Sequence, residues 1–270
     1  MCVAKAIHQM FFHMKTIKAL WYSALACLLM LPVSQSFGQG RGDSPDDGWQ
    51  FMLAPYLLMG SVSGDATVGV AGPAEVDMNF GDILEKLQFA FMAHGEVFKG
   101  NWGLIADYAY LKLGDDITTQ QIGVVDITQK QTILETFISR RFRQQWGWFD
   151  VYGGIRYWDN SLDLELEGFE ITRLSFGENW VDPVIGGRVI YNFSDRFTGN
   201  FRGDIGGFGV GSDFSYNLQP GVGYHFSDWF TLMLQYKYLY TNYSNDKEGL
   251  DFFDYKASTH GPLLGVLFRF

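Results

Sequence analysis

The sequence is poor in cysteine, in basic residues and in long apolar runs. Its 270 residues contain only two cysteines, Cys2 and Cys27. The chain beyond Cys27 therefore has no thiol from which to build a disulfide, a cysteine metal site or a redox centre. Lysine and arginine number 20 against 30 acidic residues, which leaves a formal net charge of −10. Because binding to a phosphate backbone depends on clustered basic residues, this composition argues against a nucleic-acid partner.

Only one stretch is continuously apolar, Ala19 to Leu31, and the mean hydropathy of −0.03 is too low for a polytopic helical membrane protein. Lys15 and Lys18 precede this run, and the small, polar sequence PVSQSFGQG follows it. The three regions are typical of a secretory signal peptide, which we assign to residues 1–38, with translation starting at Met14 as an alternative. Residues 39–48 are then expected to form a short periplasmic segment.

Aromatic residues and glycine are abundant instead, with 17% aromatics and 32 glycines. From Trp49 onward, segments of roughly 10 to 14 residues carry an apolar or aromatic residue at every second position, which is the period of a sheet with two different faces. Four pairs of segments are joined by very short turns, around positions 100, 144, 195 and 228. The opposite connections are mostly long and acidic, as in transmembrane β-barrels.

These patterns predict an all-β protein, a transmembrane antiparallel up-and-down barrel over residues 49–270. Ten strands fit best, with eight or twelve as alternatives, and an even number places both termini on the periplasmic side. Strand-like pieces at 66–70, 75–80 and 162–168 are expected to extend hairpins above the membrane, and 80–87 to form a short helix. The expected strands are 49–59, 87–98, 102–113, 131–142, 147–158, 181–193, 197–208, 212–226, 229–243 and 255–270.

One face of the predicted strands carries charged residues of both signs, which we place inside the barrel. A ten-strand lumen is not much wider than one that side chains fill, and an unpaired buried charge is costly, so we expect a closed interior with an ion-pair network. A narrow permeation path and a catalytic lumen are the alternatives. The expected network consists of Glu96, Asp107, Glu135, Arg141, Asp150, Arg156, Asp182, Arg188, Arg202, Asp204, Lys237 and Arg269.

Aromatic residues near the strand ends predict two interfacial girdles. The girdle at the short turns is expected to contain Phe98, Trp102, Phe142, Trp146, Trp148, Phe193, Phe197, Phe226, Trp229 and Phe268. The girdle at the long loops is expected to contain Tyr56, Tyr110, Tyr157, Tyr238, Tyr240 and Tyr243.

The closing sequence LLGVLFRF alternates between the two faces. Its lipid face, Leu264, Val266, Phe268 and Phe270, is similar to the terminal signature that the outer-membrane assembly machinery recognises. We therefore expect these four residues to serve as an assembly signal, with Arg269 pointing into the lumen.

Candidate catalytic and metal sites are weak. His225 and Ser227 have a spacing that resembles the lipid A 3-O-deacylase motif, but a position at a periplasmic turn favours plain turn residues. His94 with Glu96 and Asp107 could transfer protons, although a satisfied lumen network is the simpler interpretation. Asp163, Glu165 and Glu167 offer oxygen ligands for a divalent cation, and equally fit a solvated acidic face. We expect no enzyme, no cofactor and no specific metal site.

Several motifs resemble a family of Gram-negative outer-membrane β-barrel proteins of uncharacterised function, small and porin-like. They include GGIRYW at 153–158, WVDPVIGGR at 180–188, DIGGFGVGS at 204–212 and GPLLGVLFRF at 261–270. The resemblance implies location in the outer membrane, with its lipids and lipopolysaccharide as partners, the assembly machinery during biogenesis, and an unknown extracellular ligand. The resemblance says almost nothing about activity. We expect a structural or surface-interaction role, with a low-conductance channel, or a lipid A-modifying or proteolytic barrel enzyme, as alternatives.

Overall fold

The computed structural model describes residues 48–70, 72–119, 123–166 and 173–270, all within one compact unit, 44–270. The predicted signal peptide, 1–38, and all but the last residue of the segment 39–48 lie outside the described residues. In the described part, no helix is long and apolar enough to cross a membrane.

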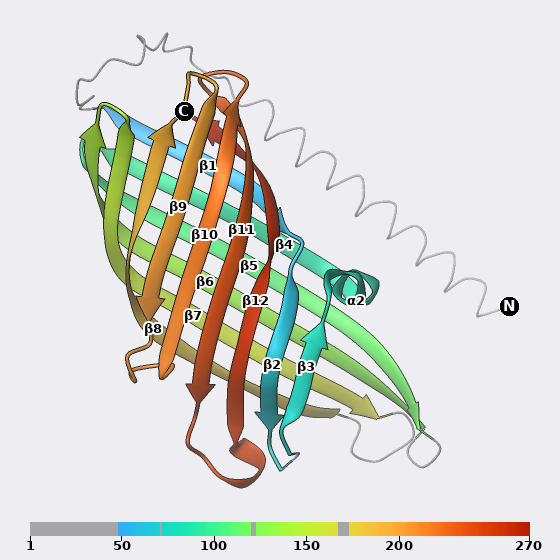
Figure 1. Ribbon diagram of the computed structural model, residues 1–270. Coiled ribbons are helices and arrows are strands. Elements are labelled where there is room, and N and C mark those ends of the chain that lie inside the picture. The colour runs from blue at the N-terminus through green and yellow to red at the C-terminus, as the bar shows by residue number, and fades with distance from the viewer. Residues whose placement is uncertain (1–47, 71, 120–122, 167–172) are drawn as a thin grey trace, which may run out of the picture. The chain divides into compact units, whose positions relative to one another are not determined.

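Twelve strands and two short helices make up the described structure (Figure 1). Their bounds are β1 Trp49–Leu58, β2 Ser61–Val68, β3 Ala74–Met78, α2 Phe80–Lys86, β4 Leu87–Lys99, β5 Trp102–Thr119, β6 Gly123–Gln144, β7 Gly147–Leu166, β8 Arg173–Asn192, β9 Phe197–Gly206, β10 Phe214–His225, β11 Phe230–Ser244, the 3-10 helix η1 Gly249–Asp251, and β12 Phe253–Arg269.

Ten of the strands form a closed antiparallel barrel, which confirms the predicted fold class and strand number. Strands β4 to β12 pair each with the next, and β1 pairs with both β4 and β12, so the sheet has no free edge at this level. The start of β1 and the end of β12 lie side by side at the short-turn end, where Phe270 and Phe51 exchange backbone hydrogen bonds. Closure removes the unpaired edges that an open sheet would present.

The two additional strands continue the wall beyond the closed level. β12 pairs with β1 over 263–269 and with β2 over 253–260, and β3 then pairs with the far edge of β2. Gly261 lies where β12 changes its partner from β2 to β1. A side chain there would place its Cβ 2.3 Å from the carbonyl oxygen of Met59, so only glycine fits.

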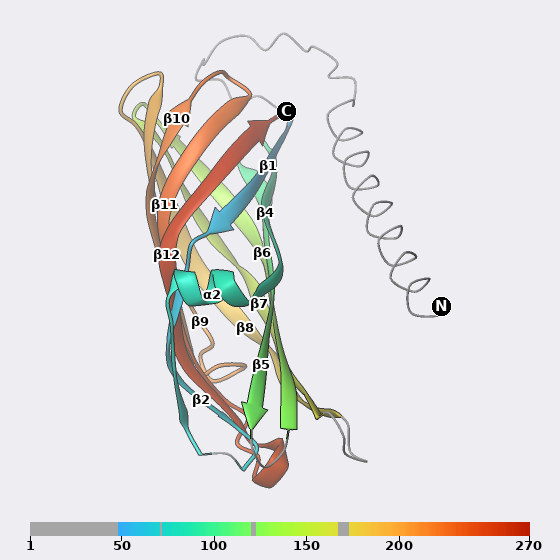
Figure 2. The same cartoon turned by 90° about the vertical axis from the view of Figure 1, so that its right-hand side faces the viewer.

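Helix α2 links β3 to β4 and packs beside the barrel wall (Figure 2). It begins at an Asn79 capping box, in which the Asn79 side chain accepts from backbone N–H groups and Asp82 accepts from the Asn79 N–H. Lys86, in its last turn, pairs with Asp115 of β5 at 2.6 Å. The predicted helix at 80–87 is thus confirmed, and its ion pair attaches it to β5.

Strands β5 to β8 run well past their predicted ends. The predicted loops 114–130 and 159–179 are largely strand, and β6 and β7 keep one register from Gln144 opposite Gly147 to Val125 opposite Leu166. Backbone pairing continues because residues such as Ile127, Thr128 and Leu164 keep the alternation that suits a sheet. The strand-like piece at 162–168 is therefore the continuation of β7 as far as Leu166.

Pro220 lies inside β10 and interrupts its pairing without forming a bulge. The register is unchanged on both sides, with Leu218 opposite Tyr238 and Gly221 opposite Gln235. Pro220 still pairs with Phe201 of β9. On the β11 side, only the pairings of Gln219 and Pro220 are missing. Because proline has no N–H to donate, the ladder loses bonds there without gaining a residue.

Most residues assigned to the girdles face outward, as expected, among them Trp102, Phe193 and Trp229. Four others lie inside the barrel: Tyr56, Phe98, Trp148 and Tyr243. The physical reason is the period of two, since Phe98 stands two residues from Glu96, and Trp148 two residues from Asp150.

The outward face should not accept a charge at mid-strand. Leu234 is 51% exposed and lies between Val222 and Leu264, which are also exposed. Leu234→Arg is expected to reduce the free energy of folding into lipid vesicles by about 2–4 kcal/mol. Urea titration and heat-dependent gel mobility measure the effect.

The matched control is Leu84→Arg, because Leu84 is equally exposed but lies on α2, outside the strands of the barrel. This variant should fold like the parent. Equal behaviour of the two variants would contradict a lipid-facing position for Leu234.

Candidate functional site

The charged residues of the lumen are arranged in two rows that follow directly from strand register. Residues opposite one another on neighbouring strands point to the same face. The first row crosses β4 to β8 and consists of His94, Asp107, Glu135, Arg156 and Asp182. The second crosses β6 to β10 and consists of Arg141, Asp150, Arg188, Arg202 and Gln219.

One cluster joins Arg156 and Arg202 to Glu135 and Asp204. Arg156 donates to Glu135 and to Asp204, each at 2.6 Å. Arg202 also donates to both acids, to Glu135 at 2.6 Å and to Asp204 at 3.3 Å. All four side chains are buried, and each carboxylate is shared by two guanidinium groups.

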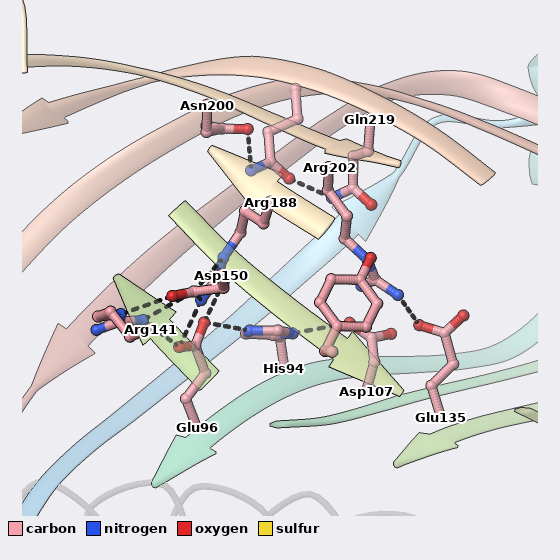
Figure 3. A network of polar contacts seen from close by, with 12 residues as sticks. His94, Glu96, Asp107, Glu135, Arg141, Asp150, Arg188, Asn200, Arg202 and Gln219 are labelled. Carbon is pink, nitrogen blue, oxygen red and sulfur yellow. Dashed lines mark hydrogen bonds and ion pairs between the residues drawn. The ribbon is translucent and has the colours of Figure 1, made fainter. Parts of the chain in front are cut away.

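A second cluster lies nearer the short turns (Figure 3). Arg188 of β8 donates to Asp150 at 2.7 Å and reaches across the lumen to Glu96 of β4, with bonds of 2.5 and 2.9 Å. Arg141 donates to Asp150 at 2.9 Å and lies 3.6 Å from Glu96. The Arg188–Glu96 pair thus ties together strands that are not neighbours in the sheet.

His94 connects Asp107 of the first row to Glu96 of the second cluster. Its Nε2 lies 2.8 Å from Glu96 Oε1, and its Nδ1 lies 3.1 Å from Asp107 Oδ2 (Figure 3). Asp107 also accepts a 2.6 Å hydrogen bond from the hydroxyl of Tyr56. Since carboxylates only accept, a ring between two of them is best satisfied as the imidazolium, which donates from both nitrogens.

Three expected network members have other surroundings. Asp182 is buried but accepts from the backbone N–H of Ser212 at 2.6 Å and from the Ser215 hydroxyl, rather than from a cation. Lys237 is buried in the lumen without a direct bond to any described residue. Arg269 lines the lumen near the short turns.

A layer of aromatic side chains fills the lumen toward the long-loop end, and sequence reasoning missed it. Trp180 stacks on Tyr243 with ring centroids 3.9 Å apart and on Trp158 at 5.5 Å. Phe253 and Tyr255 complete the layer, and all five residues are buried. The alternation of the strands could have revealed it. Trp158 stands two residues from Arg156, and Trp180 two residues from Asp182, so both share the lumen face.

On the other side of the network, toward the short turns, lies a cavity of about 110 Å³. Three amides, Gln219, Gln235 and Asn200, form a hydrogen-bonded chain along its wall, with bonds of 2.5 and 3.1 Å. This chain links β10, β11 and β9 beside the missing rungs at Pro220, so side chains replace the lost backbone bonds.

The weak metal candidates are already satisfied or lie outside the described residues. Asp163 accepts from Ser175 at 2.7 Å and pairs with Lys130 and Arg173, each at 3.0 Å. The Ser175 hydroxyl and the Lys130 ammonium lower the pKa of Asp163 to about 2. Glu165 lies 3.8 Å from Arg173, and Glu167 is outside the described residues. Across the described ranges, no group of three or more His, Cys, Asp or Glu side chains is placed to hold an ion.

The deacylase-like pair is not assembled. His225 Nδ1 lies 2.7 Å from the hydroxyl of Thr231, whereas the buried hydroxyl of Ser227 has no hydrogen-bond partner within the described part of the chain. The residues proposed as an assembly signal all belong to the outer face, where Phe268 packs against Trp229 and Phe230, and Leu264 and Phe270 are exposed.

Comparison with solved structures shows which known fold the barrel has. The chain is similar to the outer membrane protease OmpT from Escherichia coli, with a TM-score of 0.51 at 11% identity, covering 85% of this chain and 99% of that one. The chain has the outer-membrane β-barrel fold. Weaker likenesses are to Ail of Yersinia pestis (TM-score 0.37, 11% identity, 83% and 99% covered) and to Neisserial surface protein A (0.36, 13%, 83% and 99%). No protein-family model and no curated protein matches the sequence.

Removing one carboxylate from the barrel's network should be strongly destabilising. Glu135→Gln leaves Arg156 and Arg202 buried with a neutral partner, and we expect it to cost about 3–5 kcal/mol of folding free energy. Glu165→Gln is the matched control, since its side chain is 56% exposed and an exposed pair contributes about 0–1 kcal/mol. Reversible unfolding in urea measures both, and equal costs would contradict the structural importance of the lumen network.

Proposed function

We propose that this protein is an integral outer-membrane barrel with a closed lumen and a structural or surface-interaction role. The observation that carries the proposal is the set of ion pairs that cross the lumen, above all Arg188 with Glu96 and Arg202 with Glu135. Such pairs occupy the space through which a solute would have to pass. The stacked layer around Trp180 supports the same conclusion from the other half of the barrel.

The energetics favour a network that stays in place. Opening a path would require separating guanidinium groups from carboxylates that are themselves buried, and a buried charge without its partner costs several kcal/mol. Each of Glu135, Asp150 and Glu96 has two arginine partners. If one arginine moved away, the carboxylate would keep its second arginine, but the displaced guanidinium would be left without an acidic partner. A channel would need a hydrated route around both the ion-pair network and the aromatic layer.

No catalytic role is part of this proposal. Both ring nitrogens of His94 face carboxylates, which leaves neither free to take a proton from a substrate. The exposed apolar band and the outward residues of β12 fit insertion into a bilayer by the outer-membrane assembly machinery, with both termini in the periplasm and the long loops outside. The long-loop end would then contact lipopolysaccharide and any extracellular ligand.

Planar-bilayer conductance of the refolded protein tests the closed lumen. The wild-type protein is expected to produce no stable open level, whereas a wide porin in the same bilayer produces steps. A variant that thins both the ion-pair network and the aromatic layer, Trp158→Ala, Trp180→Ala, Glu96→Ser and Arg188→Ser, should conduct more than the wild-type protein if it inserts. The Arg188–Glu96 pair is removed as a whole, so it leaves no lone charge of its own. A stable open level from the wild-type protein would overturn the proposal and favour the low-conductance channel.

A further inference from the structure

Lys237 is a lumen cation whose role the described network leaves open. It lies on β11, opposite Gly261, and is 6% exposed. Its ammonium makes no hydrogen bond or ion pair with any residue that the structure describes, although its charge acts on Asp107 and Glu135 at longer range. A buried ammonium gains from an anionic partner, since burial without one is costly.

Lys237 belongs to the lining of the 110 Å³ cavity. From β1, β11 and β12 the cavity lining includes four apolar side chains, Met52, Met233, Leu263 and Leu267, beside the polar Thr231 and Gln235. The facing side carries the network residues Glu96, Arg141 and Arg188. The cavity thus combines an ammonium without a direct partner with a hydrocarbon wall, which is the surface that an amphipathic anion fits.

We propose that the cavity binds a small amphipathic carboxylate, with its carboxylate group on the Lys237 ammonium and its hydrocarbon part against Met233, Leu263 and Leu267. A cavity of about 150 Å³ accepts benzene, so this smaller one suits a short alkyl chain of about three carbons. The lining extends to His225 and Arg269, beside the short turns and the barrel end, so the ligand enters from that end. Such a dead-end site needs no open path through the barrel.

Binding of butyrate to the refolded wild-type barrel tests the site by saturation-transfer NMR or calorimetry. Butyrate should bind about tenfold or more tightly than butyramide, which has the same shape without the charge, because a charge-assisted bond contributes about 1.5–3 kcal/mol. Butylammonium should not bind. Acetate should bind more weakly than butyrate, since it lacks the hydrocarbon part.

Lys237→Met should remove the preference for butyrate over butyramide, whereas Lys256→Met, on an exposed lysine of the same sheet, should leave it unchanged. Heat-dependent gel mobility shows whether each variant is folded. Should Lys237→Met fail to fold, the wild-type series decides the question alone. Equal binding of butyrate and butyramide, or butyrate binding that survives Lys237→Met, would overturn the proposal. Neither result depends on whether the lumen conducts.

Discussion

The structure depends on charges that are buried inside a narrow barrel and must therefore be paired there. Ten strands enclose a space that side chains can fill, and water is scarce around Glu135, Arg156 and Asp182, none of which is exposed. A buried charge without a partner is costly, so the arginines of the two clusters, Arg141, Arg156, Arg188 and Arg202, each lie against an acid. The positions of the lumen side chains follow from this requirement.

Pairing across the lumen also resolves a conflict that the sheet creates. Arg188 and Arg202 stand directly opposite one another on β8 and β9, where like charges repel. Arg188 turns toward Glu96 and Asp150, and Arg202 turns toward Glu135 and Asp204. The two clusters separate for this reason, and His94 links Glu96 of the second cluster to the neighbouring Asp107.

Much of the fold could be predicted because a strand has only two faces. Once Arg156 is placed inside, Arg202 and Glu135 on nearby strands can be assigned by the same alternation, and the outward face of β11 follows likewise. The same rule places Phe98 and Trp148 inside, so the errors in the girdles came from reading position along the strand without its parity. The extension of β5 to β8 was harder to foresee, since long acidic loops and long acidic strands differ little in composition.

The sequence by itself determined the class of fold, the number of barrel strands and which residues share the lumen, since period-two alternation and turn length are local properties. Only the tertiary structure decided which acid pairs with which base, because Glu96 meets Arg188 across 92 positions of chain through closure of the barrel. Closure likewise brought Trp158, Tyr243 and Tyr255 into one layer and left Lys237 beside a cavity. These relations depend on strand tilt and side-chain reach, which no local pattern encodes.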